Sequence, residues 1–157
     1  MLYEEFLKII DEKQEIFCGI SDFLWDNPET AFGEYKAVEM LTTLLEQNGF
    51  TITRNVADIP TAFTATYGDG TPRMGILAEF DALEGMSQEA GITEKKPIAG
   101  VANAHGCGHN LFAGGSVAAT FAVKAYIEQT GKGSITLFGC PAEETGAGKV
   151  YMARAGI

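Results

Sequence analysis

The segment His105-Gly106-Cys107-Gly108-His109 has the residue types and spacing of a transition-metal site. Three side chains that can bind a metal occupy alternate positions, and the glycines between them let the backbone bend tightly around a small ion. Thiolate and imidazole ligands suit zinc and its neighbours, not calcium or magnesium. Both histidines of the chain fall within this pentapeptide, so we favour a metal site over an exposed flexible loop.

Two acidic segments could complete such a site. Glu143-Glu144 follows a strand-like run at 134–138, and the rim of an α/β sheet is where such folds place active sites. Neighbouring side chains diverge, so one glutamate can bind metal while the other takes a proton from water. Glu79-Phe80-Asp81 ends another apolar run, where a carboxylate could orient a histidine ligand. A solvated glutamate pair and a capping aspartate remain alternative interpretations of these segments.

The three cysteines are odd in number and widely spaced, so no disulfide framework follows from them. We expect Cys18 to be a small core residue on the first helix and Cys140 to be structural. Cys107 could instead be a nucleophile activated by the nearby imidazoles. A thiol hydrolase, however, brings its histidine from a distant part of the chain. Both histidines here lie two residues from Cys107, so the pattern favours metal binding.

The apolar spacing predicts four helices. The first covers the N-terminal region and ends before Asn27-Pro28, because proline disfavours a helical residue ahead of it. A second is closed by Asn48-Gly49 as its C-terminal cap. The expected helices are the N-terminal one from residue 2, then 35–45, 111–129, and a last one that begins near Gly148.

Between these helices the sequence predicts strands at 50–56, 62–67, 74–80 and 134–138. The run at 74–80 is almost wholly apolar, which is typical of a strand buried on both faces. Residues 81–109 form a long glycine-containing loop, of the kind that is functional or mobile. Helices that alternate with buried strands predict an α/β fold, a three-layer α/β/α sandwich around a mixed, mostly parallel sheet.

Composition excludes several classes of partner and location. The chain has 157 residues, enough for one domain, and carries 21 acidic against 11 basic residues. This net charge of −10 argues against nucleic acid or an anionic membrane surface as partner. The charged N-terminal segment does not resemble a secretory signal, and no apolar run has the length of a membrane helix. We therefore expect a cytoplasmic protein with free thiols.

Several ordered motifs make the sequence recognisable. Glu79-Phe80-Asp81-Ala82-Leu83, Cys107-Gly108-His109-Asn110 and Cys140-Pro141-Ala142-Glu143-Glu144 resemble one branch of the di-metal carboxypeptidase and aminoacylase family. Within that branch, residues 80–88 look most like the aminobenzoyl-glutamate hydrolase type. Asn27-Pro28-Glu29, with Phe32 and Glu34, is similar to the N-terminal region of that family. The resemblance covers essentially the whole chain and implies a zinc-exopeptidase-like fold.

The resemblance also implies a role for four residues at a centre of two divalent metal ions, zinc or manganese. Cys107 would bridge the ions, in the place of an aspartate in related branches. His109 and Glu144 would be metal ligands. Glu143 would be the general base that acts on water.

Asp81 and His105 would support this centre, Asp81 as the strand-end acid and His105 as a near-site residue without a ligand role. Asn110 stands where many members have an acid. The implied reaction is hydrolysis of an amide that joins an acyl or aminobenzoyl group to an amino acid, or of a small peptide. The implied partner is thus a small-molecule amide.

Related sequences continue with a further histidine ligand, a lid and dimerisation domain, and a last histidine ligand. On this basis we expect residues 1–157 to be the N-terminal part of a catalytic domain that is incomplete and inactive alone. We expect the full-length protein to be a homo-oligomer, and this part of it to self-associate through uncovered apolar surface. The alternative is a non-catalytic remnant that serves as a metal-binding or interaction module.

Overall fold

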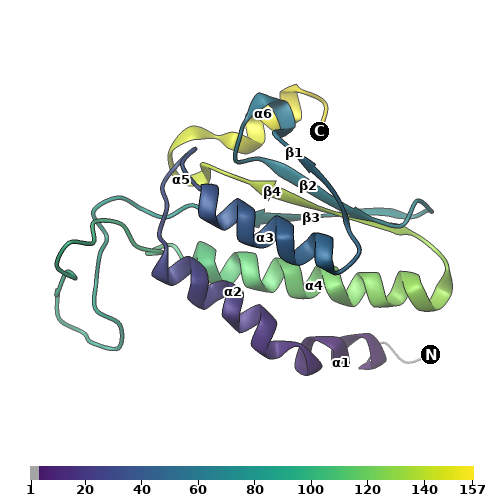
Figure 1. Ribbon diagram of the computed structural model, residues 1–157, viewed down its shortest axis with the longest axis horizontal. Coiled ribbons are helices and arrows are strands. Elements are labelled where there is room, and N and C mark those ends of the chain that lie inside the picture. The colour runs from purple at the N-terminus through teal and green to yellow at the C-terminus, as the bar shows by residue number, and fades with distance from the viewer. Residues whose placement is uncertain (1–3) are drawn as a thin grey trace.

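The computed structural model describes residues 4–157, which form a four-stranded sheet with helices on both faces (Figure 1). On one face, α3 and α4 contact the strands, and α1 and α2 pack outside α4. On the other face, α6 lies beside the short 3-10 helix η1. The helices are α1 (Glu4–Glu12), α2 (Gln14–Asp26), α3 (Tyr35–Gln47), η1 (Val56–Asp58), α4 (His109–Thr130), α5 (Glu143–Gly146) and α6 (Gly148–Arg154); the strands are β1 (Thr51–Arg54), β2 (Phe63–Tyr67), β3 (Arg73–Glu79) and β4 (Ser134–Cys140).

The strand order is β1-β2-β4-β3, and the sheet is mixed, as predicted. The expectation of mostly parallel pairing is wrong, because β1 with β2 and β2 with β4 are antiparallel. Only β3 and β4 run parallel, and α4 is the crossover between them. The parallel pair is the important one for function, since both of its strands end at the same edge of the sheet.

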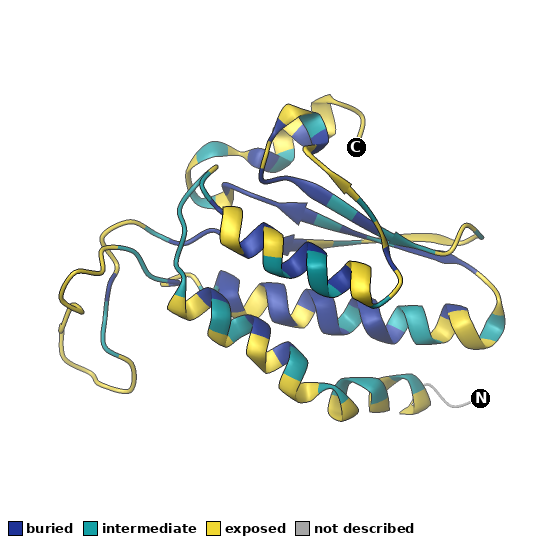
Figure 2. Cartoon of the chain, in the orientation of Figure 1, coloured by how far each residue is buried: buried dark blue, intermediate teal, exposed yellow. Residues whose placement is uncertain are grey.

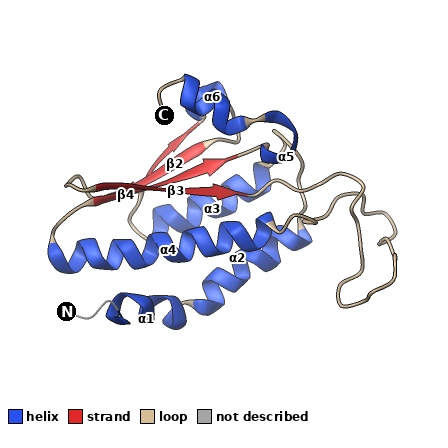
Figure 3. Ribbon diagram, turned by 180° about the vertical axis from the view of Figure 1, so that it is seen from behind, coloured by secondary structure: helices blue, strands red, loops and turns tan. Residues whose placement is uncertain are grey.

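Strand β3 is not buried on both faces, contrary to the prediction from its apolar sequence. It lies at the edge of the sheet, and Met74 and Leu77 are 39% and 46% exposed. Ala78 is buried in the core that the sheet shares with α4. The opposite face is covered only in part, by α6 (Figure 3), and most residues of β3 are exposed or half-buried (Figure 2).

The N-terminal region is two helices, where the sequence predicted one. Lys13, with φ −111° and ψ 17°, separates α1 from α2, and the first residues of the predicted helix lie outside the described part of the chain. Helix α2 buries Phe17, Ile20 and Leu24. Cys18 is exposed, so its predicted core position is wrong. One residue after Phe17, it is rotated by about 100° to the outer face.

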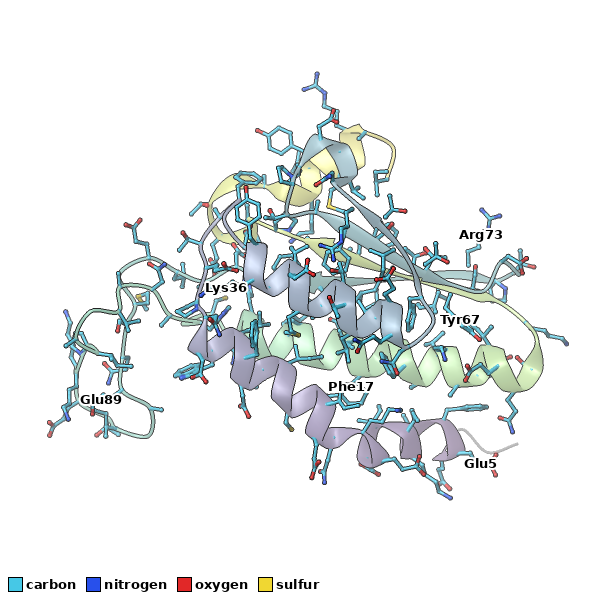
Figure 4. The ribbon with its side chains drawn as sticks, in the orientation of Figure 1. Glu5, Phe17, Lys36, Tyr67, Arg73 and Glu89 are labelled. Atoms are coloured by element: carbon cyan, nitrogen blue, oxygen red, sulfur yellow. The ribbon has the colours of Figure 1, made fainter. Side chains whose placement is uncertain are left out.

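The segment between β3 and α4 is a long loop that extends away from the sheet, with Glu89 far from the strands (Figure 4). Its base is closed by reciprocal backbone hydrogen bonds between Leu83 and Ala104, of 3.0 and 3.1 Å. A salt bridge of 2.7 Å joins Lys96 to Glu89 further out. Because its base is closed, the two ends of the loop lie together at the edge of the sheet, just before α4 begins.

Gly139 provides a test of how tightly the sheet packs. It pairs with Phe63 across β2 and β4, and a Cβ atom there would lie 2.1 Å from Cε1 of the buried Phe63 ring. We expect Gly139→Ala to lower the free energy of unfolding by about 1–3 kcal/mol in urea denaturation. The control is Gly115→Ala on the exposed side of α4, where a Cβ meets nothing within 4 Å. It should raise stability by up to about 1 kcal/mol, and equal losses in both variants would contradict this packing.

Candidate metal centre

The candidate centre lies where the parallel strands β3 and β4 end, at the left end of the sheet in Figure 1. Glu79 pairs with Cys140 in the last register position of the two strands. Asp81 follows β3, while Glu143 and Glu144 open α5 just after β4. Helix α4 begins at the same edge, and Arg73 marks the opposite end of β3 (Figure 4). The topology therefore brings together the acidic segments that were predicted from the sequence.

His109 is the first residue of α4, two positions earlier than the predicted start of that helix. Gly108 before it has φ +84°, a left-handed conformation that favours glycine and lets the chain turn sharply between Cys107 and His109. This turn directs the imidazole inward, and the His109 side chain is 6% exposed. Gly108 thus allows the turn that brings His109 to the ends of β3 and β4.

Asp81 fixes the orientation of the His109 ring. The ring atom Nδ1 lies 2.9 Å from Asp81 Oδ1 and 3.0 Å from the Asp81 carbonyl oxygen. Both neighbours are acceptors that a proton on Nδ1 would satisfy, and this tautomer would leave the lone pair of Nε2 free to bind a metal ion. Asp81 is fully buried, and its second oxygen, Oδ2, accepts a hydrogen bond of 2.9 Å from the Glu144 backbone N–H. One carboxylate therefore aligns α4 and α5.

Three carboxylates face the Nε2 atom of His109. The distances are 3.2 Å to Glu79 Oε2, 3.7 Å to Glu143 Oε2 and 3.9 Å to Glu144 Oε1. All of these atoms are acceptors when Nε2 is unprotonated. The Glu144 Oε1 atom is also buried without a hydrogen-bond partner. A cation among these atoms would satisfy them together.

Two overlapping ligand sets result, each with its donor atoms within 4.8 Å of one another. One consists of Cys107, His109 and Glu144, and the other of Glu79, His109 and Glu143. Sulfur, imidazole nitrogen and carboxylate oxygen are the donors that zinc and related transition metals take in proteins. The residues present therefore fit a transition-metal centre, in a geometry that includes all four residues predicted for it.

Glu79 and Lys149 belong to this site but were not assigned to it from the sequence. Lys149 Nζ on α6 donates a hydrogen bond of 2.5 Å to Glu79 Oε1, while Glu79 Oε2 faces His109. The position of Glu79 two residues before Asp81 was an available signal, because residues i and i+2 of an extended chain point to the same side. Lys149 had no comparable signal.

Comparison with known proteins identifies this arrangement. Residues 75–157 match the model of Peptidase family M20/M25/M40. The chain belongs to this family. One component of the p-aminobenzoyl-glutamate hydrolase of Escherichia coli (strain K12) is 44% identical over 98% of this chain and 33% of its own length. A human Xaa-Arg dipeptidase is 31% identical over 94% of this chain and 34% of its own length.

A solved M20 structure shows the same fold. It is a Bacillus subtilis protein described as a dinuclear metal binding peptidase, with a TM-score of 0.74 and 23% identity over 93% of this chain and 40% of that chain. The present chain spans about a third of the length of the curated relatives it matches. Among the described residues, no helix is long and apolar enough to cross a membrane.

Cys107 is an exposed thiol with a raised pKa. Hydrogen bonding to Glu144 is the main influence that raises the pKa of Cys107, followed by burial and by the charges of Glu144, Glu143 and Glu79. A raised pKa reduces the thiolate fraction at neutral pH, which is unfavourable for the thiol-nucleophile alternative. Cys140, which we expected to be structural, is buried, and burial raises its pKa to about 11.

Alkylation of the folded chain tests this description of Cys107. We expect its rate with iodoacetamide to be lower at pH 8 than that of an unperturbed thiol and to rise with pH, because the raised pKa delays thiolate formation. Zinc should protect Cys107 but not Cys18, which is also exposed and lies on α2. Mass spectrometry of labelled peptides measures both rates. Equal effects of zinc on the two thiols would contradict the ligand set.

His105 lies beside the ligand sets but not within them. It is 5% exposed, and neither ring nitrogen has a hydrogen-bond partner. Burial lowers the pKa of His105, which favours the neutral ring. Together with Trp25 and Cys107 it lines a hollow next to the centre. The structure thus places it beside the site, and neither ligand set includes it.

Proposed function

We propose that this chain carries the metal-binding and proton-transfer residues of an enzyme that hydrolyses the amide bond of an N-acyl amino acid, aminobenzoyl-glutamate or a small peptide. The main support for this proposal is the arrangement at His109, whose Nδ1 lies against Asp81 while Nε2 faces three carboxylates. The names of the relatives, a p-aminobenzoyl-glutamate hydrolase component and an Xaa-Arg dipeptidase, support this choice of substrates.

The proposed cofactor is a pair of divalent ions, zinc or manganese. Cys107, His109 and Glu144 would hold it, since their donor atoms lie within 4.8 Å of one another. The Bacillus subtilis neighbour, described as dinuclear and metal binding, supports two ions in this fold. When bound, such ions polarise the scissile carbonyl and make water a stronger nucleophile at neutral pH.

Glu143 is the proposed general base. Its Oε2 lies 3.7 Å from His109 Nε2 and its side chain is 37% exposed, so it is next to the centre and still open to water. The carboxylate takes a proton from the attacking water and later delivers it to the nitrogen of the leaving amine. Glu144, which is 17% exposed and whose backbone N–H is bound to Asp81, has the more constrained side chain expected of a ligand.

The test uses the full-length gene product, loaded with zinc or manganese. Aminobenzoyl-glutamate, N-acyl amino acids and dipeptides ending in arginine are assayed for release of the free amino acid. We expect hydrolysis of at least one class and its loss after treatment with a chelator. Metal binding without turnover of any of these amides would support the non-catalytic metal-binding module and contradict the proposed activity.

A further inference from the structure

Glu34 is a buried acid that the proposed chemistry does not use. Its side chain is fully buried at the start of α3, and Oε1 accepts a hydrogen bond of 2.9 Å from the Ala142 backbone N–H. The second oxygen, Oε2, has no hydrogen-bond partner. Burial is the main influence that raises the pKa of this carboxyl group. A buried acid is costly to a fold, which points to a specific use for it.

Its partner Ala142 is the residue immediately before Glu143. Ala142 has φ 53° and ψ 44°, the left-handed conformation that is unfavourable for any residue with a Cβ atom. Such backbone strain persists only where surrounding contacts hold it. This turn sets the direction in which α5 leaves β4 and therefore where Glu143 and Glu144 point.

The loop that carries Glu34 contacts both acidic strand ends. In this loop, residues 28–34, the Glu29 carbonyl accepts a hydrogen bond of 2.8 Å from Ala82, which follows Asp81. The Phe32 ring packs on Gly146 at the end of α5, so closely that a Cβ there would lie 2.6 Å from the ring. The loop lies just before Lys36 in Figure 4. These contacts place one N-terminal segment against both halves of the centre.

We infer that Glu34 is a positioning residue of the candidate metal centre, because its carboxylate holds Ala142 in the left-handed turn that aims Glu143 and Glu144. The inference rests on the proposed function for the meaning of that centre. The hydrogen bond of Glu34 is to the Ala142 backbone, so it acts on Glu143 and Glu144 through the backbone. Its role differs from that of Asp81, which contacts His109 directly.

Three variants separate positioning from plain stability. Glu34→Gln keeps an acceptor oxygen for Ala142, whereas Glu34→Met keeps the approximate size and removes that oxygen. The matched control is Thr42→Val, which removes a buried hydrogen bond of 2.6 Å to Val38 within α3, without contact to the centre. All variants are studied below their own unfolding temperatures.

The first readout requires no metal. Amide hydrogen exchange by NMR should be faster by at least about tenfold at Ala142 and Glu144 in Glu34→Met, because the turn loses its acceptor. Glu34→Gln should restore slow exchange, and Thr42→Val should leave these amides unchanged relative to the rest of the sheet. Wild-type exchange at both amides in folded Glu34→Met would overturn the inference. Should Glu34→Met not fold, the same comparison is made in an Ala142→Gly background, where the left-handed turn is unstrained.

The second readout is cobalt binding, followed by the absorption bands of the bound ion. We expect Glu34→Met to weaken binding by about 10–100-fold, as loss of an outer supporting residue does, and to change the band positions. The cobalt affinity of Glu34→Gln should stay within about threefold of wild type, because glutamine keeps an acceptor oxygen for the Ala142 N–H. If Glu34→Met bound cobalt with wild-type affinity and spectrum, the inference would fail. Absence of cobalt binding by the wild-type chain would overturn the proposed function instead, and the exchange measurement would still decide the role of Glu34.

Discussion

Replacement of Glu143 by glutamine should lower kcat of the full-length protein by about 10²–10⁴-fold, the range that positioned proton transfer contributes. In the wild-type chain, Glu143 Oε2 lies 3.7 Å from His109 Nε2. Glutamine has nearly the same size and can occupy the same position. It cannot take a proton from water. The expected loss is therefore one of chemistry and should persist at saturating metal, where any weakening of cobalt binding through the ligand set with Glu79 and His109 is overcome.

Glu144→Gln is the matched control, because it changes the neighbouring residue in the same way. Glu144 belongs to the ligand set with Cys107 and His109, so this variant should lose cobalt affinity first. Activity measured at saturating metal and cobalt titrations of the same preparations distinguish the two roles. The assignment of base and ligand would have to be exchanged if Glu143→Gln lost metal while Glu144→Gln lost only turnover.

Replacement of Asp81 by asparagine should weaken zinc or cobalt binding by about 10–100-fold, the usual effect of losing the partner of a histidine ligand. Asp81 accepts hydrogen bonds from His109 and from the Glu144 backbone through its two carboxylate oxygens. Asparagine has one acceptor oxygen, so its amide N–H₂ must face either the Nδ1–H of His109 or the Glu144 N–H. The free energy of unfolding should fall as well, because the mismatch is buried.

Isothermal titration with zinc measures the affinity, and urea denaturation without metal measures the stability. Asp22→Asn is the control, an identical change at an exposed acid that lines the hollow beside His105. It should alter neither quantity by more than the experimental error. Unchanged zinc affinity in folded Asp81→Asn would show that the His109 ring is oriented by something other than Asp81.

Much of the site could be predicted because its residues stand in short, informative patterns. The alternating residues around Cys107 and the acid pair after an apolar run are visible in the sequence, and the structure brings their donor atoms within 4.8 Å of one another. Glu34 and Lys149 could not be found in this way. Each acts on a residue 108 or 70 positions away, and no local periodicity encodes such a contact.

The errors about the fold have a related cause. An apolar run such as β3 predicts a strand but not how many of its faces are covered, because coverage depends on elements elsewhere in the chain. The exposure of Leu77 and the direction of the β2–β4 pairing are both results of this kind. The break at Lys13 and the outward position of Cys18 are smaller errors. For Cys18, a shift of one residue along a helix turns the side chain by about 100°.

The distances along the chain between contacting site residues have a consequence for the order of folding. Asp81 lies 28 residues from His109 and 63 from Glu144, and Glu34 lies 108 residues from Ala142. Long-range contacts must overcome the entropy of closing these loops, and parallel strand pairing is correspondingly slow. We therefore expect the centre to assemble late, after β3 and β4 have paired and α4 has packed on them. A metal ion would consequently stabilise the finished protein without acting as the nucleus for its folding, unlike the ion of a zinc finger.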